Sequence, residues 1–240
     1  MTNSKTSPGA PSEKAALAGK LAGSRAERAV WVFCGDSITD GMTRTQGRRN
    51  YVELVAYRVR EERGQVLHAF VNTAVRGAIT ADILGDLEYR VLRYQPNIFS
   101  LMIGMNDCVR LTQEQFRANL ESIVGQVRQR CGAEVVLQTC NAIHPELHPE
   151  RGAFPLFMKV LRQTAHDLGA FLVDHCAVWE ETRVQRRAVF DSWMADRGHP
   201  NALGHWVLAD RILRDLDLGA IEQTAPVPSV IETTRQDRRS

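Results

Sequence analysis

Short apolar runs alternate with longer helix-like segments along most of this chain, and this alternation constrains the fold more than any other feature. The apolar runs are nearly continuous, as in IFSLMI at 98–103, which is typical of strands buried on both faces of a parallel sheet. The pattern predicts an α/β fold with helices on both faces of the sheet. The expected strands are 29–34, 68–72, 98–103, 134–139 and 170–174.

The segments between these runs place apolar residues three and four positions apart, which is the spacing of an amphipathic helix. One segment begins at Thr112 with Gln115 three residues later, a start that resembles a capping box. Another begins near Thr80 and stops before Pro96, which cannot continue a helix. The expected helices are 51–62, 81–94, 112–130, 155–168 and 201–216. Joined by right-handed crossovers, these elements predict a three-layer α/β/α sandwich with a five-stranded parallel sheet.

The two ends of the chain do not follow this pattern. Residues 1–27 are interpreted as a loosely attached arm with a short helix at 14–25, and residues 223–240 as a disordered tail that carries two prolines and terminal charges. A single folded domain is therefore expected over 28–222, a length that suits one packed core.

Charge and hydropathy exclude several classes of function. With 30 basic and 28 acidic residues, the net charge of +2 gives no general attraction to nucleic acid or to an anionic membrane. No apolar run is long enough to span a bilayer, and the N-terminal segment lacks the apolar core of a secretory signal. An odd cysteine count of five, without paired spacing, agrees with a reducing compartment. We therefore expect a cytoplasmic protein without membrane insertion.

Cysteines follow several of the expected strands, where their side chains could either bind a metal ion or simply pack in the core. Small buried thiols are ordinary packing residues, whereas a metal site would need nearby histidines at a suitable spacing. The spacing does not require a metal, and we expect none, although a metal-dependent hydrolase stays an alternative. The side chains concerned are Cys34, Cys108, Cys140, Cys176, His144, His148 and His175.

Four short segments carry residues suited to acyl transfer, each just after an expected strand or just before the last helix. Gly-Asp-Ser at 35–37 offers a hydroxyl nucleophile at the end of the first strand, provided that a base takes its proton. A glycine at 77 offers an unobstructed backbone N–H, and Asn106 an uncharged amide donor suited to an oxyanion. Asp196 lies three residues before His199, where a carboxylate can orient an imidazole. Each segment alone is also ordinary turn chemistry.

Taken together, in the order Ser, Gly, Asn, Asp-x-x-His, the segments resemble the SGNH hydrolases, also called the GDSL esterases and lipases. The resemblance runs from about Trp31 to Leu216 and makes 28–222 an SGNH hydrolase domain. It implies a flavodoxin-like sheet and no metal or organic cofactor. Two departures are small: Ile38 replaces the leucine of the first block, and Ala74 stands where glycine or serine is frequent.

The resemblance also implies a role for each matching residue. Ser37 takes the position of the nucleophile, His199 that of the general base, and Asp196 that of the residue that orients it. The backbone N–H groups of Ser37 and Gly77 and the side-chain amide of Asn106 would form the oxyanion hole. The two residues between Asp196 and His199 keep the required spacing.

Other polar and aromatic residues near these segments are interpreted as structural. Arg44, Arg48 and Arg49 are expected to form a solvated basic loop, with contact to an anionic substrate group as the alternative. The histidines of 144–148 are expected to be plain loop residues, with a loop that borders the pocket as the alternative. His205 is expected to be a packing or capping residue, whereas Trp193 suits a substrate-stacking wall and a core position equally.

These observations favour a serine esterase that acts on small, soluble carboxylic esters, such as acetyl groups on a carbohydrate. The connections are short and no long apolar segment suggests the lid of a lipase. A lysophospholipase, a thioesterase and an acyltransferase of the same fold stay open, as does a non-catalytic binding protein. The expected partner is a small-molecule ester and not nucleic acid; the sequence leaves the oligomeric state open.

Overall fold

The computed structural model describes residues 28–222 and shows a five-stranded, all-parallel sheet in the order β2-β1-β3-β4-β5. Every strand ends within one residue of its predicted boundary, which confirms the predicted α/β class. The predicted arm at 1–27 and tail at 223–240 lie outside the described residues. The strands are β1 (Val30–Gly35), β2 (Ala69–Asn72), β3 (Ile98–Met102), β4 (Glu134–Gln138) and β5 (Phe171–Val173).

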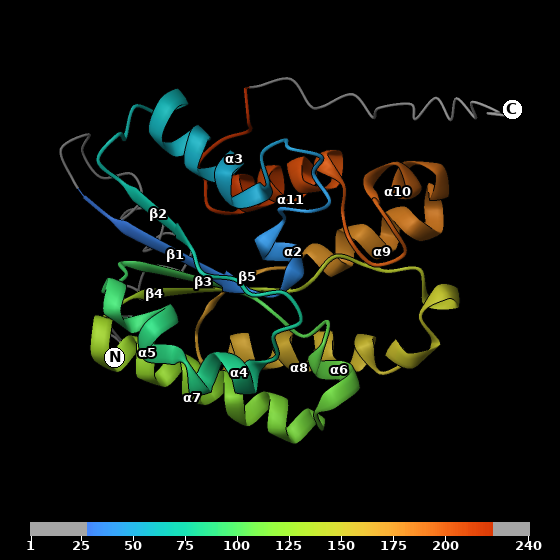
Figure 1. Ribbon diagram of the computed structural model, residues 1–240, viewed down its shortest axis with the longest axis horizontal. Helices are drawn as coiled ribbons and strands as arrows, with labels where there is room; N and C mark the ends of the chain where they lie inside the picture. Colours follow the sequence, from blue (N-terminus) through green and yellow to red (C-terminus); the bar gives the residue numbers. More distant parts are fainter. Residues whose placement is uncertain (1–27, 223–240) are drawn as a thin grey trace, which may run out of the picture.

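Helices cover both faces of the sheet, so the predicted three-layer sandwich is confirmed (Figure 1). One layer holds α2 (Ser37–Asp40), α3 (Tyr51–Tyr57), α9 (His175–Gln185), α10 (Arg187–Trp193) and α11 (Ala202–Asp215). The other holds α4 (Thr80–Gly85), α5 (Leu87–Arg90), α6 (Asp107–Arg110), α7 (Gln113–Cys131) and α8 (Phe154–Asp167). The remaining secondary-structure elements are short helical turns: the π-helical η1 (Arg58–Glu62) and the 3₁₀-helical η2 (Leu92–Tyr94), η3 (Pro145–Leu147) and η4 (Pro149–Arg151).

The strand order creates the crevice in which the site lies. From β1 the chain crosses to β2 on one side and then returns to β3 on the other side of β1. The carboxyl ends of the three strands stay level, since Phe33 pairs with Asn72 and Gly35 with Met102. In open α/β sheets, ligands bind outside the strand ends at such a switch point. The loops after β1, β2 and β3 all leave the sheet there.

The core follows the predicted periodicity. On α7 the four apolar residues at helical spacing are fully buried: Phe116, Leu120, Ile123 and Val127. The start of α7 has the predicted capping box, with Thr112 Oγ1 accepting from the N–H of Gln115 at 3.2 Å and Gln115 Oε1 accepting from the N–H of Thr112 at 3.0 Å. Burying this apolar face drives the helix onto the sheet.

The predicted helix at 81–94 is the main departure. The structure divides it into α4, α5 and η2, with Asp86 between the first two in a non-helical conformation. Gly85 weakens the helix at that point, because glycine loses more backbone entropy than other residues. The first of these helices, α4, begins at Thr80, one residue earlier than expected. The N–H and the hydroxyl of Thr80 both donate to Asp107 Oδ1 at 2.7 Å.

The sequence pattern did not predict α9 and α10. The buried positions of α9 are His175, Cys176, Trp179 and Thr182, and only one of them is a large apolar residue. The helical spacing is present, but polar and small side chains conceal it. Within residues 28–222, no helix is both long and apolar enough to cross a membrane.

Candidate active site

The abrupt end of β1 presents Ser37 at the carboxyl edge of the sheet. The backbone turns at Asp36, whose Oδ1 accepts from the N–H of Ile38 at 2.9 Å and so caps α2, with Ser37 as its first residue. Gly35 allows this turn, because a Cβ there would lie 2.4 Å from the carbonyl oxygen of Met102. The serine is thus held by a strand on one side and a capped helical turn on the other.

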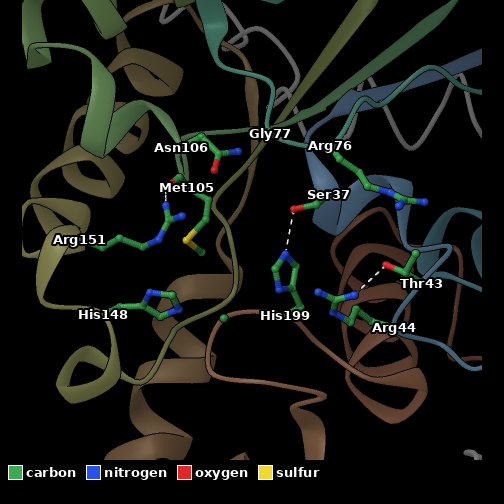
Figure 2. Close-up of a pocket in the computed structure, with 11 residues that line it drawn as sticks. Ser37, Thr43, Arg44, Arg76, Gly77, Met105, Asn106, His148, Arg151 and His199 are labelled. Carbon is green, nitrogen blue, oxygen red and sulfur yellow. Dashed lines mark hydrogen bonds between the residues drawn. The ribbon is translucent and has the colours of Figure 1, made fainter.

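Ser37, His199 and Asp196 form a continuous chain of hydrogen-bonding groups (Figure 2). Ser37 Oγ lies 3.0 Å from His199 Nε2, across 162 residues of sequence. On the other side of the ring, His199 Nδ1 lies 2.9 Å from Asp196 Oδ1 and 3.1 Å from Asp196 Oδ2. Nδ1 therefore donates to the carboxylate, which leaves the lone pair of Nε2 directed at the serine hydroxyl. The three residues have the mutual geometry of a nucleophile, a base and an orienting acid.

A short loop before α11 fixes the acid and the imidazole. Asp196 Oδ1 accepts from the backbone N–H groups of Gly198 at 2.9 Å and His199 at 2.8 Å. An antiparallel bridge between Met194 and Pro200 closes the base of the loop. Asn201 then caps α11, because its Oδ1 accepts from the N–H groups of the first turn.

Arg44 reaches the same carboxylate from the loop after α2. Its Nε donates to Asp196 Oδ2 at 2.8 Å. Partial burial alone would raise the pKa of Asp196, but hydrogen bonds from Gly198, Arg44 and His199 outweigh it and hold that pKa well below its ordinary value. The expectation of a purely solvated basic loop was therefore wrong for Arg44. Nothing in the sequence reveals this contact, because 152 residues separate the partners.

Gly77 and Asn106, the predicted oxyanion donors, line the same pocket as Ser37. Gly77 has a φ of 75°, in the left-handed region that favours glycine, so another residue would strain this loop. The amide of Asn106 donates to the carbonyl oxygen of Ala78 at 3.2 Å and to Asp36 Oδ2 at 3.4 Å. Residues from the loops after β1, β2 and β3 thus converge, as the parallel sheet predicts.

Two buried carboxylates lie beneath these donors. Burial raises the pKa of Asp36 to about 7, with the neighbouring Asp107 adding to the rise and the hydrogen bond from Ile38 opposing it. Burial also raises the pKa of Asp107, although Thr80 donates two hydrogen bonds to its Oδ1. The other oxygen of Asp107 has no hydrogen-bond partner among the described residues. Neither carboxylate was assigned a role from the sequence.

The pocket itself is small, with a volume of about 290 Å³, and most of the residues that line it are polar. Met105 is the one large apolar side chain among the residues that line it. Several of these residues were not assigned to the site from the sequence. His148 was expected to be a plain loop residue, and no role was given to Thr43, Arg76, Met105, Arg151 and Gly198. The lining residues are Ser37, Thr43, Arg44, Arg76, Gly77, Met105, Asn106, His148, Arg151, Gly198 and His199.

Two further predictions concern residues near the last helix. Trp193 does not line this pocket. It packs against the core and makes an edge-to-face contact with Trp179, with the ring centroids 5.0 Å apart. Of the two positions considered for Trp193, the structure therefore shows the core position. His205 is buried, and its Nδ1 accepts from the N–H of Tyr51 at 3.2 Å, which confirms a packing residue. Burial lowers the pKa of His205 to about 3.

The cysteines near the strand ends are free thiols inside the protein. Cys34, Cys108, Cys140 and Cys176 are all buried, and burial raises the pKa of each thiol. Within the described part of the chain, no group of three or more His, Cys, Asp or Glu side chains is placed to hold a metal ion.

A family model for GDSL-like lipases and acylhydrolases matches residues 33–207, a span that holds the serine, the oxyanion donors and the Asp-x-x-His pair. The chain belongs to the GDSL-like lipase/acylhydrolase family. As a member of this family it is a carboxylic ester hydrolase, and its substrate is a small-molecule ester.

Named relatives agree with the family assignment. An acetylxylan esterase from Geobacillus stearothermophilus is 26% identical over 204 residues, which cover 77% of this chain and 92% of the relative. A crystal structure of an acetylxylan esterase from the same organism matches with a TM-score of 0.68 at 24% identity and covers 78% of this chain and 94% of the other. An enzyme from the metagenome of Lake Arreo, Spain, described as an alpha/beta hydrolase, matches with a TM-score of 0.68 at 23% identity, covering 79% and 95%. The structural matches share the fold.

Proposed function

We propose that this protein is a serine esterase that removes acetyl groups from small, soluble esters of polar alcohols such as carbohydrates. The observation that carries the proposal is the 3.0 Å approach of Ser37 Oγ to His199 Nε2, with Asp196 at the other ring nitrogen. A serine hydroxyl becomes a useful nucleophile when a base stands at this distance and a third group orients the base.

The proposed reaction proceeds through an acyl-enzyme on Ser37. His199 Nε2 takes the hydroxyl proton while Oγ attacks the ester carbonyl carbon, and Asp196 stabilises the resulting imidazolium. Collapse of the tetrahedral intermediate breaks the carbon–oxygen bond to the alcohol, which leaves with the proton from His199. Water then attacks the acyl carbon with His199 as base again. This releases acetate and restores Ser37.

The oxyanion of both tetrahedral intermediates would be held by three donors: the backbone N–H groups of Ser37 and Gly77 and the Nδ2 amide of Asn106. All three residues line the pocket (Figure 2). Donors fixed in advance at the point where charge develops are usually the largest single contribution to such catalysis. The contacts of Asn106 with Asp36 and Ala78 support this fixed orientation.

The size and lining of the pocket favour a short acyl group. A long acyl chain needs an extended apolar surface, whereas this pocket measures about 290 Å³ and has one large apolar side chain, Met105. The acetylxylan esterase that is 26% identical to this chain also supports acetyl esters of a carbohydrate.

A series of nitrophenyl esters from acetyl to octanoyl tests the acyl group, together with acetate release from acetylated xylo-oligosaccharides. We expect kcat/KM to be highest for acetyl and to fall steeply beyond butyryl, and the oligosaccharide to release acetate. A maximum at octanoyl would contradict the proposal and favour a lysophospholipase or thioesterase. An acyl product formed on added alcohol at the expense of acetate would identify an acyltransferase.

We also propose a cytoplasmic location. All five cysteines are free in the structure, as expected in a compartment where thiols stay reduced. Detection of the native protein in a cytosolic fraction, with none in the medium, is the corresponding test.

A further inference from the structure

The pocket around the serine is unusually rich in positive charge. Three arginines line it, Arg44, Arg76 and Arg151, and no aspartate or glutamate is among the lining residues. Two more arginines bind backbone carbonyl oxygens on the surrounding loops. Arg110 donates to that of Gly77 and Arg197 to that of Leu147, each at 3.0 Å. Cations clustered around a concave site raise the local concentration of anions.

The three lining arginines differ in what already neutralises them. Arg44 donates to Asp196 at 2.8 Å, and Arg76 donates to Asp40 at 2.9 Å. Arg151, from η4, donates through Nη1 to the carbonyl oxygen of Met105, and its closest carboxylate oxygen lies 3.8 Å from its Nε, on Glu150. Arg151 is thus the lining arginine with the longest ion pair among the described residues.

The nearest carboxylate to Arg151 is engaged elsewhere. Glu150 Oε1 lies 2.6 Å from Nδ1 of His148, and this hydrogen bond lowers the pKa of Glu150. The imidazole of His148 is nearly buried and lies close to the backbone of Gly198, where a Cβ would come within 3.0 Å of its Nε2. Glu150 thus fixes the ring of His148 and pairs with Arg151 only at 3.8 Å, so the charge of Arg151, which is held in place by the carbonyl oxygen of Met105, is weakly neutralised.

Arg151 faces the catalytic residues across the pocket. Figure 2 shows Arg151 and His148 on one wall, with Ser37 and His199 on the other. The side chain of Arg151 is 19% exposed, so it opens to the pocket but is largely shielded from bulk solvent. A partly desolvated guanidinium binds a carboxylate more strongly than an exposed one, and its planar N–H groups match the two carboxylate oxygens.

We propose that Arg151 binds a carboxylate on the alcohol portion of the ester substrate, so that the preferred substrate is an acetyl ester of an acidic sugar or hydroxy acid. The inference rests on the proposed esterase function and specifies its substrate class. An acetyl group carries no charge, so the anion that Arg151 would bind belongs to the alcohol.

Arg151 also interacts with a buried carboxylate, and an experiment has to separate this role from the proposed binding of substrate. Its charge lowers the pKa of the buried Asp36, which it approaches through the Met105 loop. If Arg151 served only as a counter-ion for Asp36, removing its charge would impair the hydrolysis of charged and neutral esters to the same extent. Recognition of a substrate carboxylate would impair charged esters selectively.

A matched pair of probes separates these two roles: 4-acetoxybenzoate and its neutral methyl ester. In the wild-type enzyme we expect a higher kcat/KM for the carboxylate, through a lower KM, and an advantage that declines as salt is added. In Arg151→Gln we expect kcat/KM for 4-acetoxybenzoate to fall about tenfold or more, and that for the methyl ester to fall less than about threefold. For 4-acetoxybenzoate, kcat/KM of Arg151→Lys should lie between the values of the wild type and of Arg151→Gln, because lysine keeps the positive charge but lacks the paired N–H groups of the guanidinium.

Arg214→Gln is the matched control, since Arg214 pairs with Asp210 on α11 and does not line the pocket. It should leave both probes unchanged. Inhibition of the wild-type enzyme by free sugars gives a readout that needs no variant: glucuronate should compete better than glucose. A stronger effect of glucose 6-phosphate than of glucuronate would replace the carboxylate by a phosphate and overturn the proposal as stated.

Equal kcat/KM for the two acetoxybenzoates in the wild-type enzyme would also overturn it. That result would leave the esterase function intact, because the neutral ester would still be hydrolysed. Failure of the proposed function would instead appear as no turnover of either probe.

Discussion

Arg44 and Asp196 form an ion pair at 2.8 Å between Nε and Oδ2, and the same carboxylate lies 3.1 Å from Nδ1 of His199, the proposed catalytic base. The loop after α2 and the loop before α11 are thereby joined at the site. Because the guanidinium stabilises the charged form of Asp196, it helps to keep this acid ionised when the pH falls.

Replacing Arg44 by glutamine should weaken catalysis by removing one of the donors that hold Asp196 against His199. The pKa of Asp196 should rise toward its ordinary value, which still lies well below neutral pH, so the carboxylate stays ionised in the assay. We expect kcat at neutral pH to fall only about two- to fivefold, since both side chains are partly exposed. Arg48→Gln, in the same loop, is the matched control. A kcat in Arg44→Gln equal to that of the wild type would contradict this role.

Asn106→Ala should lower kcat about 10²–10³-fold with little change in KM, because the amide is proposed to bind the oxyanion and not the ground-state ester. Asn106→Asp is the companion variant. It keeps the size of the side chain but replaces the donor by a negative charge, so it should be at least as inactive. Near-wild-type kcat in a folded Asn106→Ala enzyme would remove Asn106 from the oxyanion hole.

Asp36 makes the stability of the protein depend on pH in a direction opposite to that of most carboxylates. Its pKa is raised to about 7 in the folded state, so the folded chain retains a proton that the unfolded chain releases as pH rises from about 4 to about 7. Stability due to this group is therefore present at low pH and lost across that interval, by at most about 1.4 kcal/mol per pH unit.

The variant Asp36→Asn cannot titrate but can still cap α2. Urea unfolding of both proteins between pH 4.5 and 7.5 should show the wild type losing free energy of unfolding relative to the variant as pH rises. A difference that stays constant across this range would show that Asp36 does not carry the elevated pKa.

Much of the fold was predictable from local pattern. Continuous apolar runs marked all five strands, and the buried face of α7 followed from the spacing of Phe116, Leu120 and Ile123. The pattern failed at Gly85 and Asp86, where a weak helix breaks, and over α9, where His175 and Thr182 fill buried positions that apolar residues usually occupy. At these positions the tertiary contacts of the folded chain determine where a helix forms or breaks, and the sequence pattern alone gives little sign of those contacts.

The candidate site likewise contains residues that the sequence predicts and residues that it does not. Residues of the first three blocks could be identified because each block follows a strand, and parallel strands bring their carboxyl ends together. Asp196 and His199 were identified from their spacing just before the last helix. Arg44, His148 and Arg151 were not, because they belong to loops whose path depends on the assembled structure. Asp36 was visible in the first block, but its burial and its contact with Asn106 were not.

The proposed nucleophile, Ser37, can be identified by intact-protein mass spectrometry after treatment with a serine-directed phosphonate. Ser37→Ala is run in parallel, and both proteins are assayed on nitrophenyl acetate. We expect one adduct on the wild type, located on Ser37 by peptide mapping, and neither adduct nor turnover in the folded variant. An adduct at another residue, or turnover in Ser37→Ala close to that of the wild type, would contradict this assignment.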